Sequence, residues 1–218
     1  EVSALVWGEQ PPRVVLLHGG GQNAHTWDSV VLALGVPALA VDLPGHGHSD
    51  WRADRDYMPW TAAEAVVPVL RRWVADADVV VGMSLGGLTT IRLTAVTLRA
   101  GAPGGDRGHH AVSGRVPALE DPAVAGHHVP RGRALVFPTF DEIMERTAAA
   151  APQRSLSSIG RGVLHDTRRR GDGRWRWRYE RLGARTTAPR CGTTSPPLTL
   201  VRGGESAFVP DVDAEEFQ

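Results

Sequence analysis

The most constraining feature of this sequence is a serine set between glycines, in the pentapeptide Gly82-Met83-Ser84-Leu85-Gly86. The largely apolar residues 78–81 before it are typical of a buried strand, and residues 88–93 after it have a helical pattern. A G-x-S-x-G sequence between a strand and a helix predicts a tight, strained turn that lifts the serine hydroxyl above the edge of a sheet. We expect both flanking glycines to be needed because neighbouring backbone passes too close for a Cβ atom. The plainer interpretation is an ordinary glycine-rich turn.

Two further motifs follow predicted strands upstream. Residues 13–17 have the pattern of a buried strand that ends in His18-Gly19-Gly20-Gly21, and a strand at 37–41 leads into the loop 42–49, Asp-Leu-Pro-Gly-His-Gly-His-Ser. A glycine loop after a strand can turn a backbone N–H toward the serine. We therefore expect an oxyanion hole made by the amides of Gly20 and Leu85. Phosphate binding by the glycine loop is the alternative, but neither G-x-G-x-x-G nor G-K-[ST] follows.

The H-G-G-G, D-x-P-G-x-G-x-S and G-x-S-x-G patterns, in this order and at about this spacing, resemble the α/β-hydrolase superfamily. The close resemblance covers residues 2–95. It implies an α/β fold, a doubly wound, mostly parallel sheet of α/β-hydrolase type with a small helical lid. We expect residues 1–95 to form the N-terminal half of the core and 137–182 the helical lid. An irregular segment is expected at 96–136 and a partial C-terminal core at 183–218.

The resemblance implies acyl transfer with Ser84 as the catalytic nucleophile and no cofactor. In that mechanism a histidine takes the serine proton, an acid orients the histidine, and the hole of Gly20 and Leu85 binds the oxyanion. We expect His18 to hold the glycine loop rather than to act as the base. The residues expected to support the site are His18, Gly19, Gly82 and Gly86.

The base and the acid are not clearly supplied by the sequence. In the family the base histidine follows the last strand, predicted here at 198–202, but no histidine follows His165, itself a poor base candidate in the lid. The usual acid position falls on Ser206 or Ala207, which cannot serve, and some family members take the acid from an earlier strand instead. We therefore expect the chain as written to be a weak or inactive hydrolase. The acidic residues near the usual position but out of register are Glu205, Asp211 and Asp213.

The other histidines carry no assigned chemistry. His25, His46 and His48 are expected in loops. The pairs at 109–110 and 127–128 lack the supporting spacing of metal ligands, so we predict no metal site.

Residues 99–133 contain no apolar run that predicts a buried strand, although the next core strand of such a fold belongs there. We expect a gap in the sheet at this point. One interpretation is a local reading-frame shift, because residues 105–112 can be encoded so that the next frame reads Ala-Ile-Val-Asp-Ile-Thr-Pro. A similar shift fits residues 187–195. A true insertion is the alternative.

Composition narrows the function classes. The 218 residues have a formal net charge of zero, which does not favour nucleic-acid binding. The basic run Arg168-Arg169-Arg170 and the Arg- and Trp-rich residues 173–180 are the features that favour this alternative. The single cysteine, Cys191, fits a reducing compartment, and the start shows no signal-peptide pattern, so we expect a cytoplasmic protein. No apolar run is long enough to predict a membrane span.

The function predicted from these features is hydrolysis of an ester-like bond in a small apolar substrate through an acyl-enzyme on Ser84. One alternative is an impaired or non-catalytic relative that has lost the base. The other is cofactor-free haloperoxidase or carbon–carbon bond hydrolysis on the same scaffold. We expect a small-molecule substrate as the partner, and the sequence assigns no oligomeric state.

Overall fold

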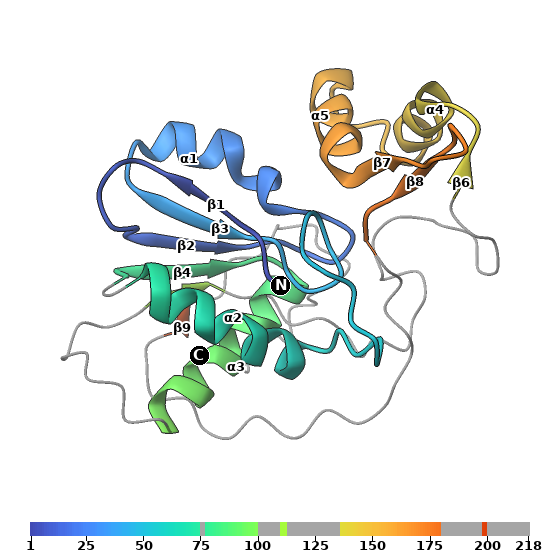
Figure 1. Cartoon of the computed structure of the whole chain (residues 1–218). Coiled ribbons are helices and arrows are strands. Elements are labelled where there is room, and N and C mark those ends of the chain that lie inside the picture. The colour runs from blue at the N-terminus through green and yellow to red at the C-terminus, as the bar shows by residue number, and fades with distance from the viewer. Residues whose placement is uncertain (75–76, 100–109, 113–135, 180–197, 200–218) are drawn as a thin grey trace, which may run out of the picture.

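Figure 1 shows the computed structural model of the chain, which describes residues 1–74, 77–99, 110–112, 136–179 and 198–199. These residues form a large sheet with helices on both faces and a smaller unit of two helices and a short sheet. Within the described part of the chain, no helix has the length and apolar character needed to cross a membrane.

The core sheet has the strand order β1-β3-β2-β4-β5-β9. Every described pairing in it is parallel except that of β1 with β3. In the central ladder Leu17 lies opposite both Val41 and Gly82, so three neighbouring strands end at the same level. The motifs that follow these strands therefore emerge together at one sheet edge. The strands are β1 (Ala4–Trp7), β2 (Val14–Leu17), β3 (Ala38–Val41), β4 (Val79–Gly82), β5 (His110–Val112) and β9 (Leu198–Thr199).

Alternate side chains of β2 and β3 point to opposite faces of the sheet, and each face is covered by its own helices. Val15 and Leu17 belong to a buried cluster with α2 (Pro59–Trp73) and α3 (Leu85–Arg99). Val14 and Leu16 belong to a second cluster, with the 3₁₀ turn η1 (Ala24–Trp27) and α1 (Asp28–Leu34). The side chains of β2 are buried on both faces, as expected for the centre of a parallel sheet. The predicted doubly wound, mostly parallel α/β fold is thus confirmed.

The prediction of a gap in the core sheet is wrong, because a strand occupies the position next to β4. His110–Val112 form β5, which pairs in parallel with β4 on one side and with β9 on the other. A three-residue strand needs only backbone partners on both sides, so a long apolar run is not required. Residues 96–99, which were also expected to be irregular, belong to α3, which continues to Arg99. Of the residues that the reading-frame hypothesis concerns, 105–109 and 187–195 lie outside the described residues.

The smaller unit, which we call the lid, covers residues 136–179. It contains α4 (Phe140–Ala150) and α5 (Leu156–Asp166), as the predicted helical lid requires. It also contains an antiparallel sheet in the order β6-β8-β7, which the sequence analysis did not predict. The helices and this sheet share a small apolar core. The three strands are β6 (Val136–Phe137), β7 (Thr167–Arg169) and β8 (Trp175–Trp177).

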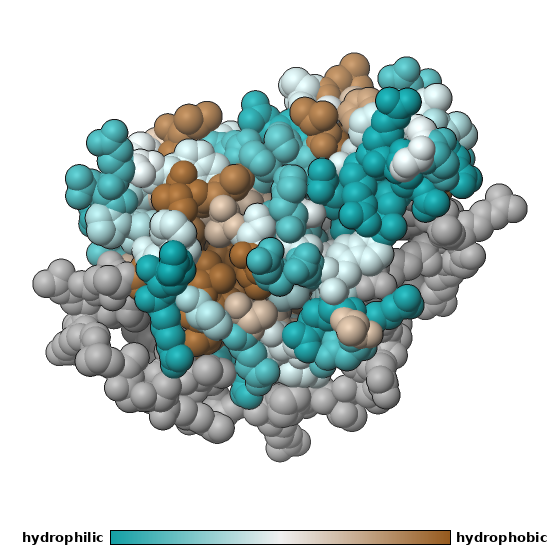
Figure 2. Space-filling view, in the orientation of Figure 1, coloured by the Kyte–Doolittle hydropathy of each residue, from teal (hydrophilic) through white to brown (hydrophobic). Residues whose placement is uncertain are grey.

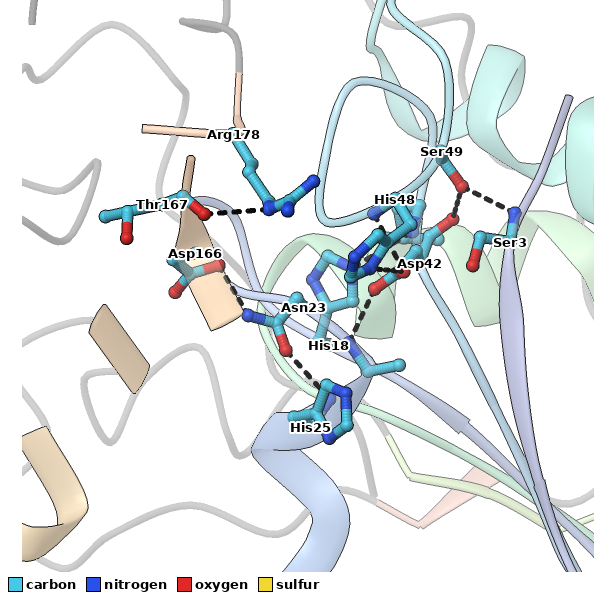
Figure 3. A network of polar contacts seen from close by, with 12 residues as sticks. Ser3, His18, Asn23, His25, Asp42, His48, Ser49, Asp166, Thr167 and Arg178 are labelled. Carbon is cyan, nitrogen blue, oxygen red and sulfur yellow. Dashed lines mark hydrogen bonds and ion pairs between the residues drawn. The ribbon is translucent and has the colours of Figure 1, made fainter. Parts of the chain in front are cut away.

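The lid contacts the core through polar groups. Asn23, just before η1, donates from Nδ2 to Oδ1 of buried Asp166 at 2.6 Å (Figure 3). Trp51 Nε1 donates to the Arg178 carbonyl at 2.7 Å. In the orientation of Figure 2 hydrophobic side chains reach the surface on the lid as well as on the core, and Leu156 and Leu164 of α5 are exposed.

We predict that Asp166→Asn reduces the pH dependence of stability. Burial raises the pKa of Asp166 from 3.8 to about 7. A carboxyl whose pKa rises on folding stabilises the folded state while it is protonated. Its contribution is therefore complete below the unfolded value of 3.8 and is lost as the pH rises to about 7. Asparagine keeps the oxygen that accepts from Asn23 but cannot ionise.

Urea unfolding of wild type and variant at about pH 5 and about pH 8 measures this effect. The free energy of unfolding should fall less between these conditions in Asp166→Asn than in wild type. Glu9→Gln, which changes an exposed carboxyl, is the control and should behave as wild type. An equal fall in wild type and Asp166→Asn would contradict the prediction.

Candidate functional site

The three sequence motifs meet at the edge of the core sheet where β2, β3 and β4 end. The Met83 amide donates to the Leu17 carbonyl at 3.0 Å, which ties the turn after β4 to the end of β2. A Cβ atom built on Gly19 would lie 3.4 Å from the Ser84 Cβ. The glycine loop and the serine turn are therefore in direct contact.

Ser84 occupies the turn between β4 and α3 with a φ of 52°, in the left-handed region. A non-glycine residue in this region carries local strain of about 1–3 kcal/mol, which persists only where the surrounding structure enforces it. The turn is enforced by the Gly86 amide, which donates to the Met83 carbonyl at 2.9 Å, and by the Leu88 amide, which donates to the Ser84 carbonyl at 3.0 Å. The serine itself is exposed, so its hydroxyl is accessible to a substrate.

The two glycines beside the serine lie against backbone. A Cβ on Gly82 would overlap the carbonyl of Gly86, and a Cβ on Gly86 would overlap the carbonyls of Leu17 and His18. Such contacts are too short for a real Cβ, so both positions require glycine because of space. The close approach holds the start of α3 against the end of β2.

The glycine loop is held by Gln22, which the sequence analysis missed. The Gly19 amide donates to Gln22 Oε1 at 2.9 Å, and the Gln22 amide donates to the Gly19 carbonyl at 3.2 Å. Because the Gly19 amide is used in this way, the Gly20 amide is the next donor along the loop. The Leu85 amide is the first of α3, and the first amides of a helix have no carbonyl partner within the helix. No pattern in the sequence singles out Gln22 for this position.

His18 is fully buried beneath the loop, and both of its ring nitrogens are engaged. The Leu43 amide donates to His18 Nε2 at 2.9 Å, which places the ring proton on Nδ1, 2.8 Å from the Gly19 carbonyl. Burial lowers the pKa of His18 to about 4. The ring is therefore neutral near pH 7 and links the loops after β2 and β3.

His46 lies beside His18, with ring centroids 5.2 Å apart. Burial, followed by the neighbouring His18, lowers the pKa of His46 to about 3. A group of such low basicity is poorly matched to proton abstraction at neutral pH.

Asp42 organises the loop that follows β3. Its carboxylate accepts from the Ala24 amide at 2.8 Å and from the His48 amide at 3.0 Å (Figure 3). A Cβ on Gly47 would overlap this carboxylate, and Gly47 has a left-handed φ of 52°. The Asp42 carbonyl accepts from Ser49 Oγ at 2.6 Å. Asp42 is thus committed to backbone amides, a role that the motif alone did not reveal.

The remaining described histidines lie where the core meets the lid. His25 is in the 3₁₀ turn η1 and not in a loop as predicted, and its ring stacks on that of His165 at the end of α5, with centroids 3.6 Å apart. Burial and then the neighbouring His25 lower the pKa of His165. Potential ligand atoms of His25, Asp28 and His165 lie within 4.8 Å of one another, a grouping that the sequence analysis did not identify. The His25-x-x-Asp28 spacing was the available sequence signal.

Several predicted candidates cannot be placed. The paired histidines near 109 and at 127–128, and the acid positions around 205–213, lie outside the residues whose side chains are described.

Comparisons with known proteins agree with this geometry. A model of the alpha/beta hydrolase family matches residues 14–216. The chain is 47% identical over 230 residues to esterase Rv0045c of Mycobacterium tuberculosis, covering 99% of this chain and 74% of the relative. A pimeloyl-[acyl-carrier protein] methyl ester esterase of Aeromonas hydrophila is 38% identical over 94 residues, covering 38% of this chain and 32% of the relative.

Solved structures extend the similarity to the fold. The crystal structure of the M. tuberculosis esterase matches with a TM-score of 0.83 at 47% identity, covering 99% of this chain and 74% of that one. A second structure of it, reported with its transition metal inhibition, has a TM-score of 0.82 at 46% identity, covering 99% and 76%. From the span of the family model and from this relative, we conclude that the chain belongs to the α/β-hydrolase family.

Proposed function

We propose that this protein hydrolyses ester bonds of small, fairly apolar molecules through an acyl-enzyme on Ser84. The observation that carries the proposal is the exposed Ser84 at a left-handed strand-to-helix turn, in contact with the glycine loop. The similarity to the M. tuberculosis esterase supports ester hydrolysis as the reaction. The single cysteine supports our further proposal that the protein works in the reducing cytoplasm.

The proposed reaction has two halves. Ser84 Oγ forms a bond to the ester carbonyl carbon, and the ester C–O bond breaks, so that the alcohol leaves with the proton lost by the serine. Water then adds to the acyl carbon, which releases the carboxylic acid and restores Ser84. In both halves the amides of Gly20 and Leu85 donate to the carbonyl oxygen while it carries negative charge. The rigid loop contacts of Gln22 and His18 keep these donors in place without reorganisation.

The proposal assigns no general base. His18 and His46 are buried and neutral. Because neither buried histidine fits the role of the base, an impaired relative that keeps the elbow is the alternative function. An active esterase and an impaired relative can be told apart by asking whether the measured hydrolysis depends on the Ser84 hydroxyl.

We predict that Ser84→Ala lowers kcat/KM for p-nitrophenyl butyrate by at least about 10³-fold, because no acyl-enzyme forms without the Ser84 hydroxyl. Labelling by a fluorophosphonate probe should be lost as well. Ser157→Ala, an exposed lid serine, is the matched control and should keep both activity and labelling. An equally slow hydrolysis by wild type and Ser84→Ala would refute the acyl-enzyme and favour the impaired relative.

We also predict that Gln22→Ala lowers kcat by roughly 10- to 100-fold with a smaller change in KM. The Gly19 amide would lose its acceptor, so the loop that presents Gly20 would no longer be fixed. Gln22→Glu keeps an acceptor oxygen and should retain more activity than Gln22→Ala. Steady-state kinetics on the same ester measures both variants. A change confined to KM would instead assign Gln22 to substrate binding.

A further inference from the structure

A cluster of metal-ligating side chains lies at the junction of core and lid. His25 comes from η1 and Asp28 from the start of α1, whereas His165 comes from the last turn of α5 in the lid. His25 Nδ1 lies 3.2 Å from both carboxylate oxygens of Asp28, and the two imidazole rings stack with an interplanar angle of 19°. Ligand atoms of all three residues fall within 4.8 Å of one another.

We propose that His25, Asp28 and His165 bind one divalent transition-metal ion of the zinc type, which bridges the core and the lid. Two imidazoles and one carboxylate suit Zn²⁺ and its neighbours in the first transition row, whereas Mg²⁺ and Ca²⁺ prefer oxygen ligands only. Three protein ligands leave a fourth tetrahedral position for water. The site lies outside the serine turn and does not depend on the proposed ester hydrolysis.

Bonds of about 2.0–2.2 Å to one ion require ligand atoms roughly 3.3 Å apart. His25 Nδ1 and the Asp28 carboxylate already meet this at 3.2 Å, and because all ligand atoms of the cluster lie within 4.8 Å, small side-chain rotations are enough to reach one ion. All three are partly exposed, so they have room to rotate and an ion can reach them.

Arg161 competes with the ion in this site. Its Nη1 lies 2.9 Å from Asp28 Oδ2, and its side chain comes from α5, one turn before His165. The Arg161 guanidinium forms an ion pair with the Asp28 carboxylate, and its positive charge repels a divalent cation. Replacing Arg161 should therefore raise the affinity for the metal, whereas replacing a ligand should lower it. The surface pocket at this place is lined by Leu5, Val6, Trp7, His25, Asp28, Leu32 and Arg161.

A bound ion would stabilise the docked lid. Two ligands belong to the segment that follows the glycine loop, and the third precedes Asp166, which already contacts Asn23. An ion that binds only the docked arrangement adds a stability of RT ln(1 + c/Kd), where c is the free ion concentration, and this stability grows with the logarithm of c above Kd. Zinc should therefore raise the unfolding temperature of the chain progressively once its free concentration exceeds Kd.

Isothermal titration with ZnCl₂ and thermal unfolding at increasing Zn²⁺ test the proposal on the full chain. We expect one site in wild type, weakened at least about tenfold in His165→Asn and in Asp28→Asn. Arg161→Gln should tighten zinc binding about two- to fivefold, because the competing charge is removed. MgCl₂ should give no comparable effect. Circular dichroism establishes that each variant is folded.

Two control variants locate the binding. His48→Gln changes an exposed histidine outside the cluster and should leave zinc affinity as in wild type. The double variant His127→Gln/His128→Gln should also bind as wild type. Absence of zinc binding in wild type, binding unchanged in His165→Asn, or loss of the site in the 127/128 variant would each overturn the proposal. Should His165→Asn fail to fold, an Arg161→Gln affinity equal to that of wild type would overturn it independently.

Discussion

The parallel pairing of β2 with β3 and β4 is the constraint on which the rest of the site depends. Because Leu17, Val41 and Gly82 share one level of the ladder, the loops that follow them are forced into contact. His18 then joins two of these loops through Leu43 and Gly19, and the Met83 amide joins the third to Leu17. The register of the buried strands alone thus brings together residues more than sixty positions apart, without any contribution from the side chains of the site.

The strain at Ser84 is a consequence of the same packing. The left-handed backbone of Ser84 is disfavoured by itself, yet α3 can begin against the end of β2 only if the chain reverses within the turn. Gly82 and Gly86 allow that approach, and buried apolar residues of α2, α3 and the sheet hold it in place. The elbow therefore stores strain that the apolar core offsets, and the exposed hydroxyl is the result.

Local patterns predicted the parts of the fold that short segments determine. The strands before His18, Asp42 and Ser84, the turn at Ser84 and the two-sided helix cover all follow from apolar runs and glycine positions. Features that depend on distant partners were missed or wrong. The strand His110–Val112 is too short for an apolar pattern, and it exists because β4 and β9 provide partners. The lid hairpin was also missed, although Gly171-Asp172-Gly173 marks its turn, where the Arg170 amide donates to the Arg174 carbonyl at 2.7 Å.

The contacts between lid and core could not be inferred from the sequence because they join positions more than 120 residues apart. Asn23 performs two tasks there: its Oδ1 accepts from the His25 amide at 2.8 Å and caps η1, while its Nδ2 donates to Asp166. The same η1 turn continues directly from the glycine loop that Gln22 holds. A displacement of the lid that breaks the Asp166 bond therefore acts on the cap of η1, and through it on the segment leading to Gly20. In this fold the Asn23 side chain couples the placement of the lid to the shape of the oxyanion loop, and the stacking of His25 on His165 links the same η1 turn to the lid.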